Sequence, residues 1–157
     1  MILMMDPIIL RHRITRIIAA TRFPFVDQES WTDETQTIIN DETKRYGIHT
    51  PMGVLYPSIV IANADGSLKE IGIVESKDDI NESNVPKWRA LSDVAPYGRE
   101  FKKLFLYVPE GCEIRALQLI EEASINYDGI RGYRVENQVL KILPFKTLND
   151  EYDDVVT

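Results

Sequence analysis

A glutamate and a lysine two residues apart, Glu75 and Lys77, stand at the end of a β-branched run. Side chains two apart on a strand share a face, so the sequence predicts that this carboxylate and this ammonium project together. Charged groups at the end of a buried strand are costly unless they are paired or bind a metal. Together they could hold Mg²⁺, orient an attacking water and stabilise a developing phosphorane, which is the chemistry of phosphodiester hydrolysis.

A predicted hairpin brings Ser58 to the same place. Residues 56–62 and 71–75 are β-branched runs, and the link Asn-Ala-Asp-Gly-Ser between them is typical of a tight turn. A turn centred on Gly66-Ser67 would pair Ser58 directly with Glu75. A turn centred one residue earlier would shift the pairing by two and leave Ser58 on the Glu75 face. Both registers place position 58 beside the carboxylate.

These residues resemble the motif of the PD-(D/E)XK nuclease-like superfamily, in which Pro-Asp precedes a strand bearing Glu-x-Lys. The matching residues here are Tyr56-Pro57-Ser58, the hairpin and Ile-Val-Glu-Ser-Lys at 73–77, and the run from 56 to about 143 is similar to small members. The resemblance implies a restriction-endonuclease-like αβββαβ core. It also implies a Mg²⁺ site formed by Glu75, the Ser76 carbonyl and position 58, with Glu75 and Lys77 as the catalytic residues.

Two departures from the family pattern leave two functions open. Ser58 stands where the family has aspartate, and a hydroxyl is a poor, uncharged Mg²⁺ ligand. Residues 8–20 contain no acid to match the glutamate often found on the family's first helix. One hypothesis is Mg²⁺-dependent hydrolysis of nucleic-acid phosphodiester bonds. The alternative is a catalytically impaired nuclease-fold module that acts as a binding or assembly subunit, and the resemblance also suggests a homodimer.

The charge balance limits how the chain could contact nucleic acid. Its 157 residues include 18 Lys and Arg against 25 Asp and Glu, a formal net charge of −7. Nonspecific nucleic-acid binders are usually basic, because affinity scales with the phosphates they neutralise. A local basic patch or a basic partner protein remains compatible with this balance. Arg11, Arg13, Arg16 and Arg22 are either a phosphate-facing stripe or the solvated face of an amphipathic helix.

Periodicity and turn residues predict the elements that position the site. Helices are expected at 8–20, 30–47 and 83–95 and again after Gly111, and strands at 22–27, 56–62, 71–75, 103–108, 133–135 and 139–143. The inward faces should carry Trp88, Leu91 and Ala95 on the third helix and Ile114, Leu117, Ile120 and Ala123 on the fourth. Strands that alternate with helices indicate an α/β fold, a mixed β-sheet flanked by helices.

Length and segment chemistry predict one cytoplasmic domain. We expect residues 1–148 to form it and residues 149–157 to be an acidic, flexible tail. No window approaches the ~18 uninterrupted apolar residues of a membrane span, so no membrane partner is expected. Basic residues follow the apolar start, the reverse of a signal peptide. The single cysteine, Cys112, excludes an intramolecular disulfide.

Overall fold

The computed structural model describes residues 7–21, 34–98, 101–137 and 139–147. The predicted strand at 22–27 and the predicted tail at 149–157 lie outside the described residues. The helices are α1 (Pro7–Thr21), α2 (Val85–Val94) and α3 (Glu113–Glu122), with 3₁₀ turns η3 (Lys77–Asp79) and η4 (Glu82–Asn84). The strands are β1 (Gln36–Ile39), β2 (Ile48–Thr50), β3 (Gly53–Leu55), β4 (Ile59–Ala62), β5 (Leu68–Val74), β6 (Tyr97–Gly98), β7 (Phe101–Lys102), β8 (Leu104–Pro109), β9 (Gly129–Glu136) and β10 (Val139–Thr147). Within these ranges no helix combines the length and apolar character needed to cross a membrane.

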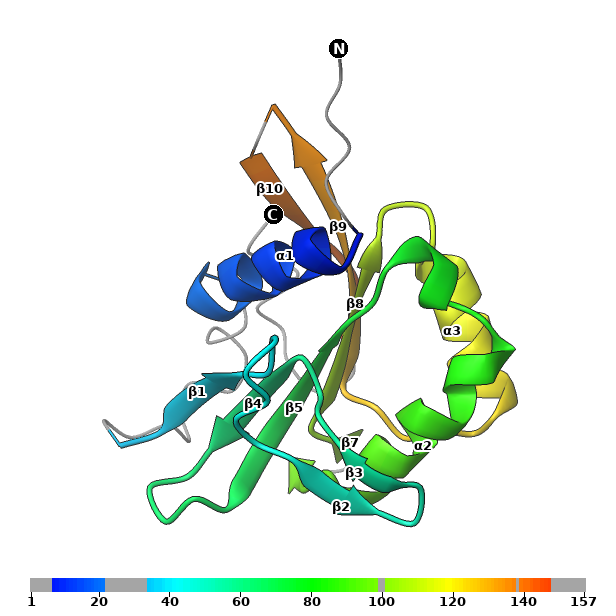
Figure 1. The fold of residues 1–157 in the computed structure, drawn as a ribbon. Coiled ribbons are helices and arrows are strands. Elements are labelled where there is room, and N and C mark those ends of the chain that lie inside the picture. Colours follow the sequence, from blue (N-terminus) through cyan, green and yellow to red (C-terminus); the bar gives the residue numbers. More distant parts are fainter. Residues whose placement is uncertain (1–6, 22–33, 99–100, 138, 148–157) are drawn as a thin grey trace.

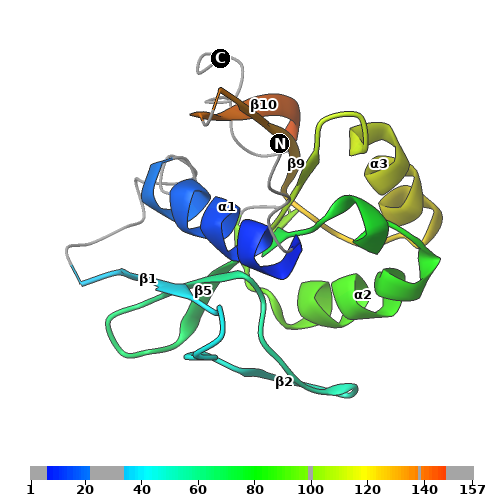
Figure 2. The ribbon, with the colours of Figure 1, turned by 45° about the horizontal axis from the view of Figure 1, so that its top comes forward.

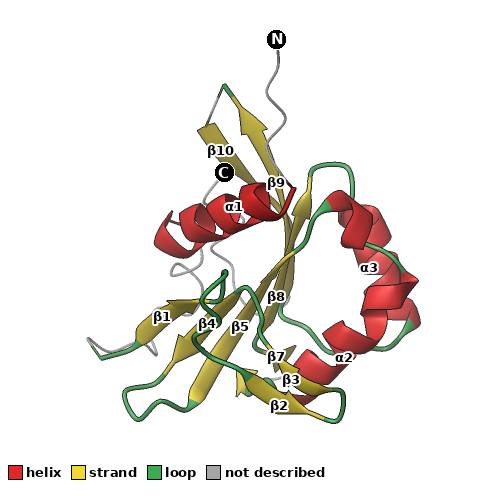
Figure 3. Ribbon diagram, viewed as in Figure 1, coloured by secondary structure: helices red, strands yellow, loops and turns green. Residues whose placement is uncertain are grey.

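One mixed sheet organises the described chain (Figures 1 and 3). Its strand order is β1-β4-β5-β8-β9-β10. β1, β4 and β5 are antiparallel neighbours, β5, β8 and β9 run parallel, and β10 returns antiparallel to β9. Parallel neighbours need crossover connections, which α2 and α3 provide. The predicted mixed sheet flanked by helices is therefore confirmed.

Helices cover both faces of the sheet. α1 lies across one face, while α2 and α3 pack on the other (Figures 1 and 2). Strand β8 shows how alternation supplies both cores: Leu104, Leu106 and Val108 pack with α2 and α3, whereas Phe105 and Tyr107 pack with α1. The end of the central strand β5 is consequently flanked by α1 on one side and by α2 on the other.

The prediction of a helix at 30–47 is wrong for the part that the structure describes. Residues 36–39 form strand β1, which pairs antiparallel with β4, and a loop follows. The β-branched sequence Thr-Ile-Ile suits an edge strand, and pairing with β4 outweighs the charges that suggested helix ends. The Asp41 carboxylate accepts from the Thr43 N–H at 3.1 Å and so forms a turn instead of a helix.

The inward face of α3 agrees with the prediction in part. Ile120 is buried, and Leu117 and Ala123 pack half-buried against the same core. Ile114 is exposed, whereas Ala116 and Leu119 are buried, so the centre of the buried face lies beside the predicted line. On α2 the prediction is confirmed, since Trp88, Leu91 and the C-cap residue Ala95 are all buried in the core shared with α3.

Candidate functional site

The β4–β5 hairpin fixes the position of Ser58. Gly66 has a positive φ of 87° in the turn, and Ile59 pairs with Gly72. Extending this pairing by one residue places Ser58 opposite Ile73, two residues before Glu75 on the same face. This is the strand pairing of the second predicted register, but the predicted two-residue turn is wrong, because the Asn63 N–H donates to the Ser67 carbonyl at 2.8 Å and the register shifts between Ile61 and Ala62. Ser58 and Glu75 line one cavity, so the predicted proximity is confirmed.

The Ser58 hydroxyl is already engaged by the neighbouring strand. It accepts a hydrogen bond from the Val74 N–H at 2.9 Å. It also donates a long hydrogen bond to the Val74 carbonyl oxygen, at 3.5 Å. The hydroxyl thus satisfies backbone groups of β5 just before β4 begins. The role that the structure gives this oxygen is structural.

The prediction that Lys77 shares a strand face with Glu75 is wrong. β5 ends at Val74, and Lys77 is an exposed residue of η3. No ion pair or hydrogen bond joins Lys77 to Glu75 within the described chain. The chain leaves the strand because the Ser76 carbonyl accepts from the Asp79 N–H at 3.0 Å and so starts the 3₁₀ turn. That same carbonyl was the further metal ligand expected from the resemblance.

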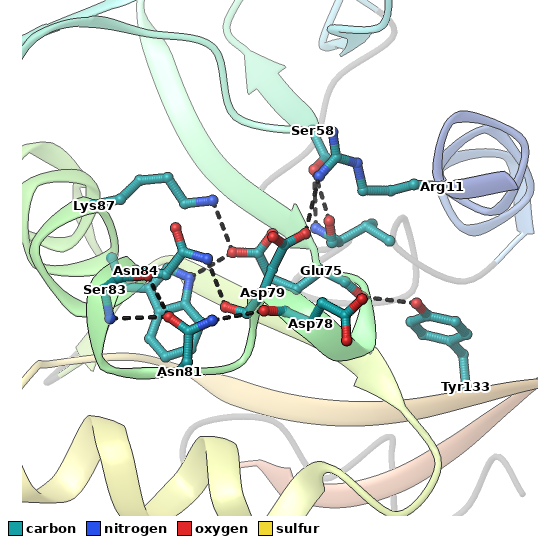
Figure 4. A network of polar contacts seen from close by, with 12 residues as sticks. Arg11, Ser58, Glu75, Asp78, Asp79, Asn81, Ser83, Asn84, Lys87 and Tyr133 are labelled. Carbon is teal, nitrogen blue, oxygen red and sulfur yellow. Dashed lines mark hydrogen bonds and ion pairs between the residues drawn. The ribbon is translucent and has the colours of Figure 1, made fainter. Parts of the chain in front are cut away.

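Glu75 is held by α2 instead (Figure 4). Its Oε2 atom accepts from Lys87 Nζ at 2.8 Å and from the Trp88 indole N–H at 2.8 Å. Its N–H donates to the Tyr107 carbonyl at 2.9 Å, and its own carbonyl accepts from the Tyr133 hydroxyl at 2.7 Å. The Glu75 side chain is only 1% exposed, whereas the Lys87 side chain is 31% exposed. A buried carboxylate of this kind is tolerated because an ammonium and a second donor satisfy it.

A cavity of about 130 Å³ opens at this end of β5, between α1 and α2. It is lined by Arg11, His12, Thr15, Asn40, Leu55, Tyr56, Pro57, Ser58, Ile73, Val74, Glu75, Lys87 and Leu91. Glu75 lines this cavity, and both of its side-chain hydrogen bonds within the described residues go to Oε2.

The lining of the cavity is positively charged although the chain is acidic. Arg11 and Lys87 bring two positive charges and Glu75 one negative charge, a net charge of +1 with His12 neutral. The whole chain has a net charge of −7. The acids that pair with Arg11 and His12, namely Asp79 at 3.4 Å and Glu42 at 3.2 Å, lie outside the lining.

The arginines of α1 do not form one stripe. Arg11 faces the cavity and Arg13 is exposed. Arg16 donates to the Asp41 carboxylate at 2.7 Å. This guanidinium, helped by hydrogen bonds from Thr43, holds the pKa of Asp41 well below its usual range. Arg22 lies outside the described residues. Of the three arginines of this group that the structure describes, Arg11 alone lines the cavity.

The donors present do not fit a resident Mg²⁺. Such a site usually combines carboxylate oxygens with several waters in octahedral geometry. Within the described residues no three His, Cys, Asp or Glu side chains gather closely enough to hold a metal. Glu75 is the single acid of the lining, and an ammonium occupies one of its oxygens. Ser58 Oγ and the Ser76 carbonyl already accept hydrogen bonds within the protein.

Lys87 and the polar role of Trp88 were missed from the sequence, and Arg11 was considered only as one member of an arginine stripe. Trp88 was predicted as core, and it is buried, but its N–H also holds Glu75. The signal for Lys87 was its spacing: Lys87 and Leu91 are four residues apart on α2, so they share a face. Both line the cavity.

Compared with protein-family models, curated proteins and solved structures, the chain matches none. The fold and site define an α/β domain with a strand-end cavity that contains a carboxylate–ammonium pair and an arginine. Function has to be argued from that cavity, because a fold alone does not specify an activity.

Proposed function

We propose that the chain is a nuclease-like α/β module that binds a ligand at the Glu75 cavity without cleaving it. The order of elements supports the kinship with the PD-(D/E)XK superfamily. α1 precedes the antiparallel strands β1, β4 and β5, and α2 then leads to β8, which runs parallel to β5. Glu75 follows directly on the last antiparallel strand, where that superfamily carries its acidic motif.

The observation that carries the binding role is the charge of the cavity. Its one carboxylate is paired with Lys87 at 2.8 Å, and its lining is net positive. A divalent cation entering there meets Arg11 and Lys87, with Glu75 the one acid of the lining and the partly exposed Asp79 beside Arg11. At short range like charges in a partly dehydrated site repel strongly, so the same lining favours an anion.

The alternatives for the partner follow from the same charges. The net charge of −7 disfavours extended contact with nucleic acid, so a nucleic-acid ligand would reach the cavity with one anionic group. In an assembly role, a partner protein with a basic surface would complement the acidic remainder of the chain.

A cleavage assay tests the absence of hydrolysis. Purified protein is incubated with single-stranded DNA, double-stranded DNA and RNA in the presence of Mg²⁺ or Mn²⁺. We expect no cleavage above the level of Glu75→Gln, an isosteric variant that keeps an acceptor for Lys87. Cleavage that disappears in Glu75→Gln would overturn the proposal, while cleavage that persists in the variant identifies a contaminating nuclease.

Hydrolysis has one observation in its favour and is the second candidate. A carboxylate that lines the cavity stands beside an ammonium, with Lys87 Nζ 2.8 Å from Glu75 Oε2. In this case Lys87 would take the place that the resemblance gives to Lys77. Any Glu75-dependent cleavage should then be lost in Lys87→Ala and retained in Lys77→Ala. Loss in Lys77→Ala alone would assign the reaction to the lysine of the resemblance.

A further inference from the structure

Three neutral polar side chains of the cavity, those of Thr15, Asn40 and Ser58, are engaged within the protein. The Thr15 hydroxyl donates to the Arg11 carbonyl at 2.8 Å. The Asn40 amide donates to two backbone carbonyls and accepts from one backbone N–H, all at 2.8 Å. The Ser58 hydroxyl bonds the backbone of β5. These three groups offer little to an anion, so its recognition depends mainly on the charged side chains.

The charged side chains retain donors. An ammonium has three N–H groups and a guanidinium has five. Within the described residues the Lys87 ammonium donates only to Glu75, and the Arg11 side chain makes only a long 3.4 Å contact with Asp79. Lys87 reaches in from α2 and Arg11 from α1, on opposite sides of Glu75 (Figure 4). Together they form a two-sided clamp for an anion, and we refer to Arg11 and Lys87 as the clamp.

The size of the cavity limits what enters it. Its volume is about 130 Å³. An apolar cavity of about 150 Å³ holds one benzene molecule. A single phosphate with its first carbon atoms is of comparable size, whereas a whole nucleotide is not. The remainder of a phosphorylated molecule must therefore project out of the cavity.

We infer that the cavity is a site for a phosphate monoester, carried by a free nucleotide or by the phosphorylated end of a nucleic-acid strand. A monoester carries about −1.5 to −2 charges at pH 7 and three acceptor oxygens, which suits a clamp with cations on two sides. An internal diester carries one charge and needs an exit for the chain on both sides. Glu75 Oε1 accepts from a P–OH group or from a neighbouring hydroxyl. The inference deepens the proposed binding role and rests on it.

Asp79 competes with the ligand for Arg11. Its side chain is 39% exposed and lies 3.4 Å from the guanidinium. Exposed ion pairs of this kind contribute little, about 0–1 kcal/mol, so a phosphate that carries more charge can displace the carboxylate. Removal of the Asp79 charge should therefore strengthen phosphate binding, a gain that a misfolded variant could not produce.

Binding can be followed through Trp88. The chain has two tryptophans, Trp31 and Trp88, so Trp31→Phe isolates the indole that bonds to Glu75. The titrations use a nucleoside 5′-monophosphate, a short 5′-phosphorylated oligonucleotide and the same oligonucleotide without the phosphate. All are run in EDTA, and calorimetry on the unsubstituted chain confirms the constants. We expect the phosphorylated probes to bind at least about ten-fold more tightly than the unphosphorylated one, the effect of one lost charged contact.

Matched variants assign the effect to the clamp. Lys87→Gln and Arg11→Gln should each weaken binding about 10- to 100-fold, the range for a hydrogen bond to a charged group. Lys141→Gln on β10 and Arg13→Gln on α1 change the net charge equally at exposed positions outside the lining, and should leave binding unchanged. Asp79→Asn should tighten binding about two- to five-fold.

The outcomes separate the ligand source and the possible failures. Equal binding of the mononucleotide and the phosphorylated oligonucleotide assigns the site to small nucleotides, and preference for the oligonucleotide assigns it to strand ends. Equal binding of phosphorylated and unphosphorylated probes overturns the inference, as does insensitivity to both clamp variants. Because binding is measured without metal and cleavage with metal, failure of this inference is distinct from failure of the proposed non-hydrolytic role.

Discussion

The Lys103–Asp128 pair and the Lys87–Glu75 pair both hold a buried carboxylate, but they differ in their access to solvent. In one, Lys103 Nζ lies 3.1 Å from Asp128, and the two side chains are 6% and 0% exposed. In the other, Lys87 Nζ lies 2.8 Å from Glu75; the carboxylate is buried, but nearly a third of the lysine side chain is exposed. The ionic chemistry is the same in both pairs. The difference lies in whether a ligand can reach the ammonium.

This difference separates a structural pair from a candidate binding pair. A sealed pair can only stabilise or destabilise the fold, because both charges have left water and neither can exchange partners. A pair with one solvated end costs less to disrupt, because water or a ligand can replace the lost partner. Only the Glu75–Lys87 pair borders the cavity, and so only that pair can exchange its interactions with a bound anion.

The largest expected effect is a loss of stability when the sealed Lys103–Asp128 pair is broken. Lys103→Met leaves the buried Asp128 carboxylate without its ammonium, which should reduce the free energy of unfolding by about 3–5 kcal/mol. Urea unfolding measures this change. The double variant Lys103→Met/Asp128→Asn serves as the control, since it removes both charges and should recover part of the loss. A loss below about 1 kcal/mol in the single variant, the size of an exposed pair, would show that the pair is not sealed.

The second-largest expected effect concerns Trp88, which bonds to the buried carboxylate of the Glu75–Lys87 pair. Trp88→Phe removes the indole N–H that donates to Glu75 at 2.8 Å. A hydrogen bond to a charged group contributes about 1.5–3 kcal/mol, and we expect a loss of stability in that range. The comparison is a double-mutant cycle with Glu75→Gln, in which the two changes should be non-additive by about 0.5 kcal/mol or more. Strict additivity would mean that Trp88 acts through packing alone.

Local sequence patterns predicted the elements that carry the site better than they predicted its residues. The hairpin was predictable because Asn63–Ser67 provides turn chemistry, including a glycine at positive φ, between two β-branched runs. The buried face of α2 was predictable from helical spacing. Each of these features depends on residues close together in the chain.

The partner of Glu75 was not predictable in the same way. Glu-x-Lys spacing suggested Lys77, but the strand ends at Val74 because η3 begins directly afterwards. Lys87 reaches Glu75 only because α2 packs back against the sheet, which is a tertiary contact. Residues 36–39 were mistaken for helix for the same reason, since their conformation is decided by pairing with β4. Local charge patterns contain no information about such contacts.

A smaller effect, with a pH dependence, is expected at Tyr133. Its hydroxyl donates to the Glu75 carbonyl at 2.7 Å, so Tyr133→Phe should cost about 1 kcal/mol at neutral pH. Burial raises the pKa of the Tyr133 hydroxyl above its ordinary value of 10. The unfolded chain therefore loses this proton at a lower pH than the folded protein does. The stabilisation that the Tyr133 hydroxyl provides is present below pH 10 and is lost as the pH rises above it.

The measurement compares unfolding curves of the wild type and Tyr133→Phe from pH 8 to pH 11. Burial also raises the pKa of Tyr127, to about 12, so both proteins should lose stability at high pH. The wild type should lose more, and the difference between the two should shrink as pH rises. Parallel curves would show that the Tyr133 hydroxyl ionises as readily in the folded protein as in the unfolded chain.

The smallest expected effect distinguishes the two lysines near Glu75. Lys77 is exposed and has no polar contact with Glu75 in the described residues, so Lys77→Gln should change stability by less than about 0.5 kcal/mol. Lys87→Gln removes the ammonium from the Glu75–Lys87 pair, in which only the lysine is partly exposed. It should reduce the free energy of unfolding by about 1 kcal/mol, a value between that of an exposed ion pair and that of the sealed Lys103–Asp128 pair. Both variants change the net charge equally. Comparing their free energies of unfolding at several salt concentrations therefore isolates the contribution of the Glu75–Lys87 pair. Only the loss in Lys87→Gln should depend on Glu75, vanishing in the Glu75→Gln background; equal losses in both lysine variants would mean that the two ammonium groups share the carboxylate in solution.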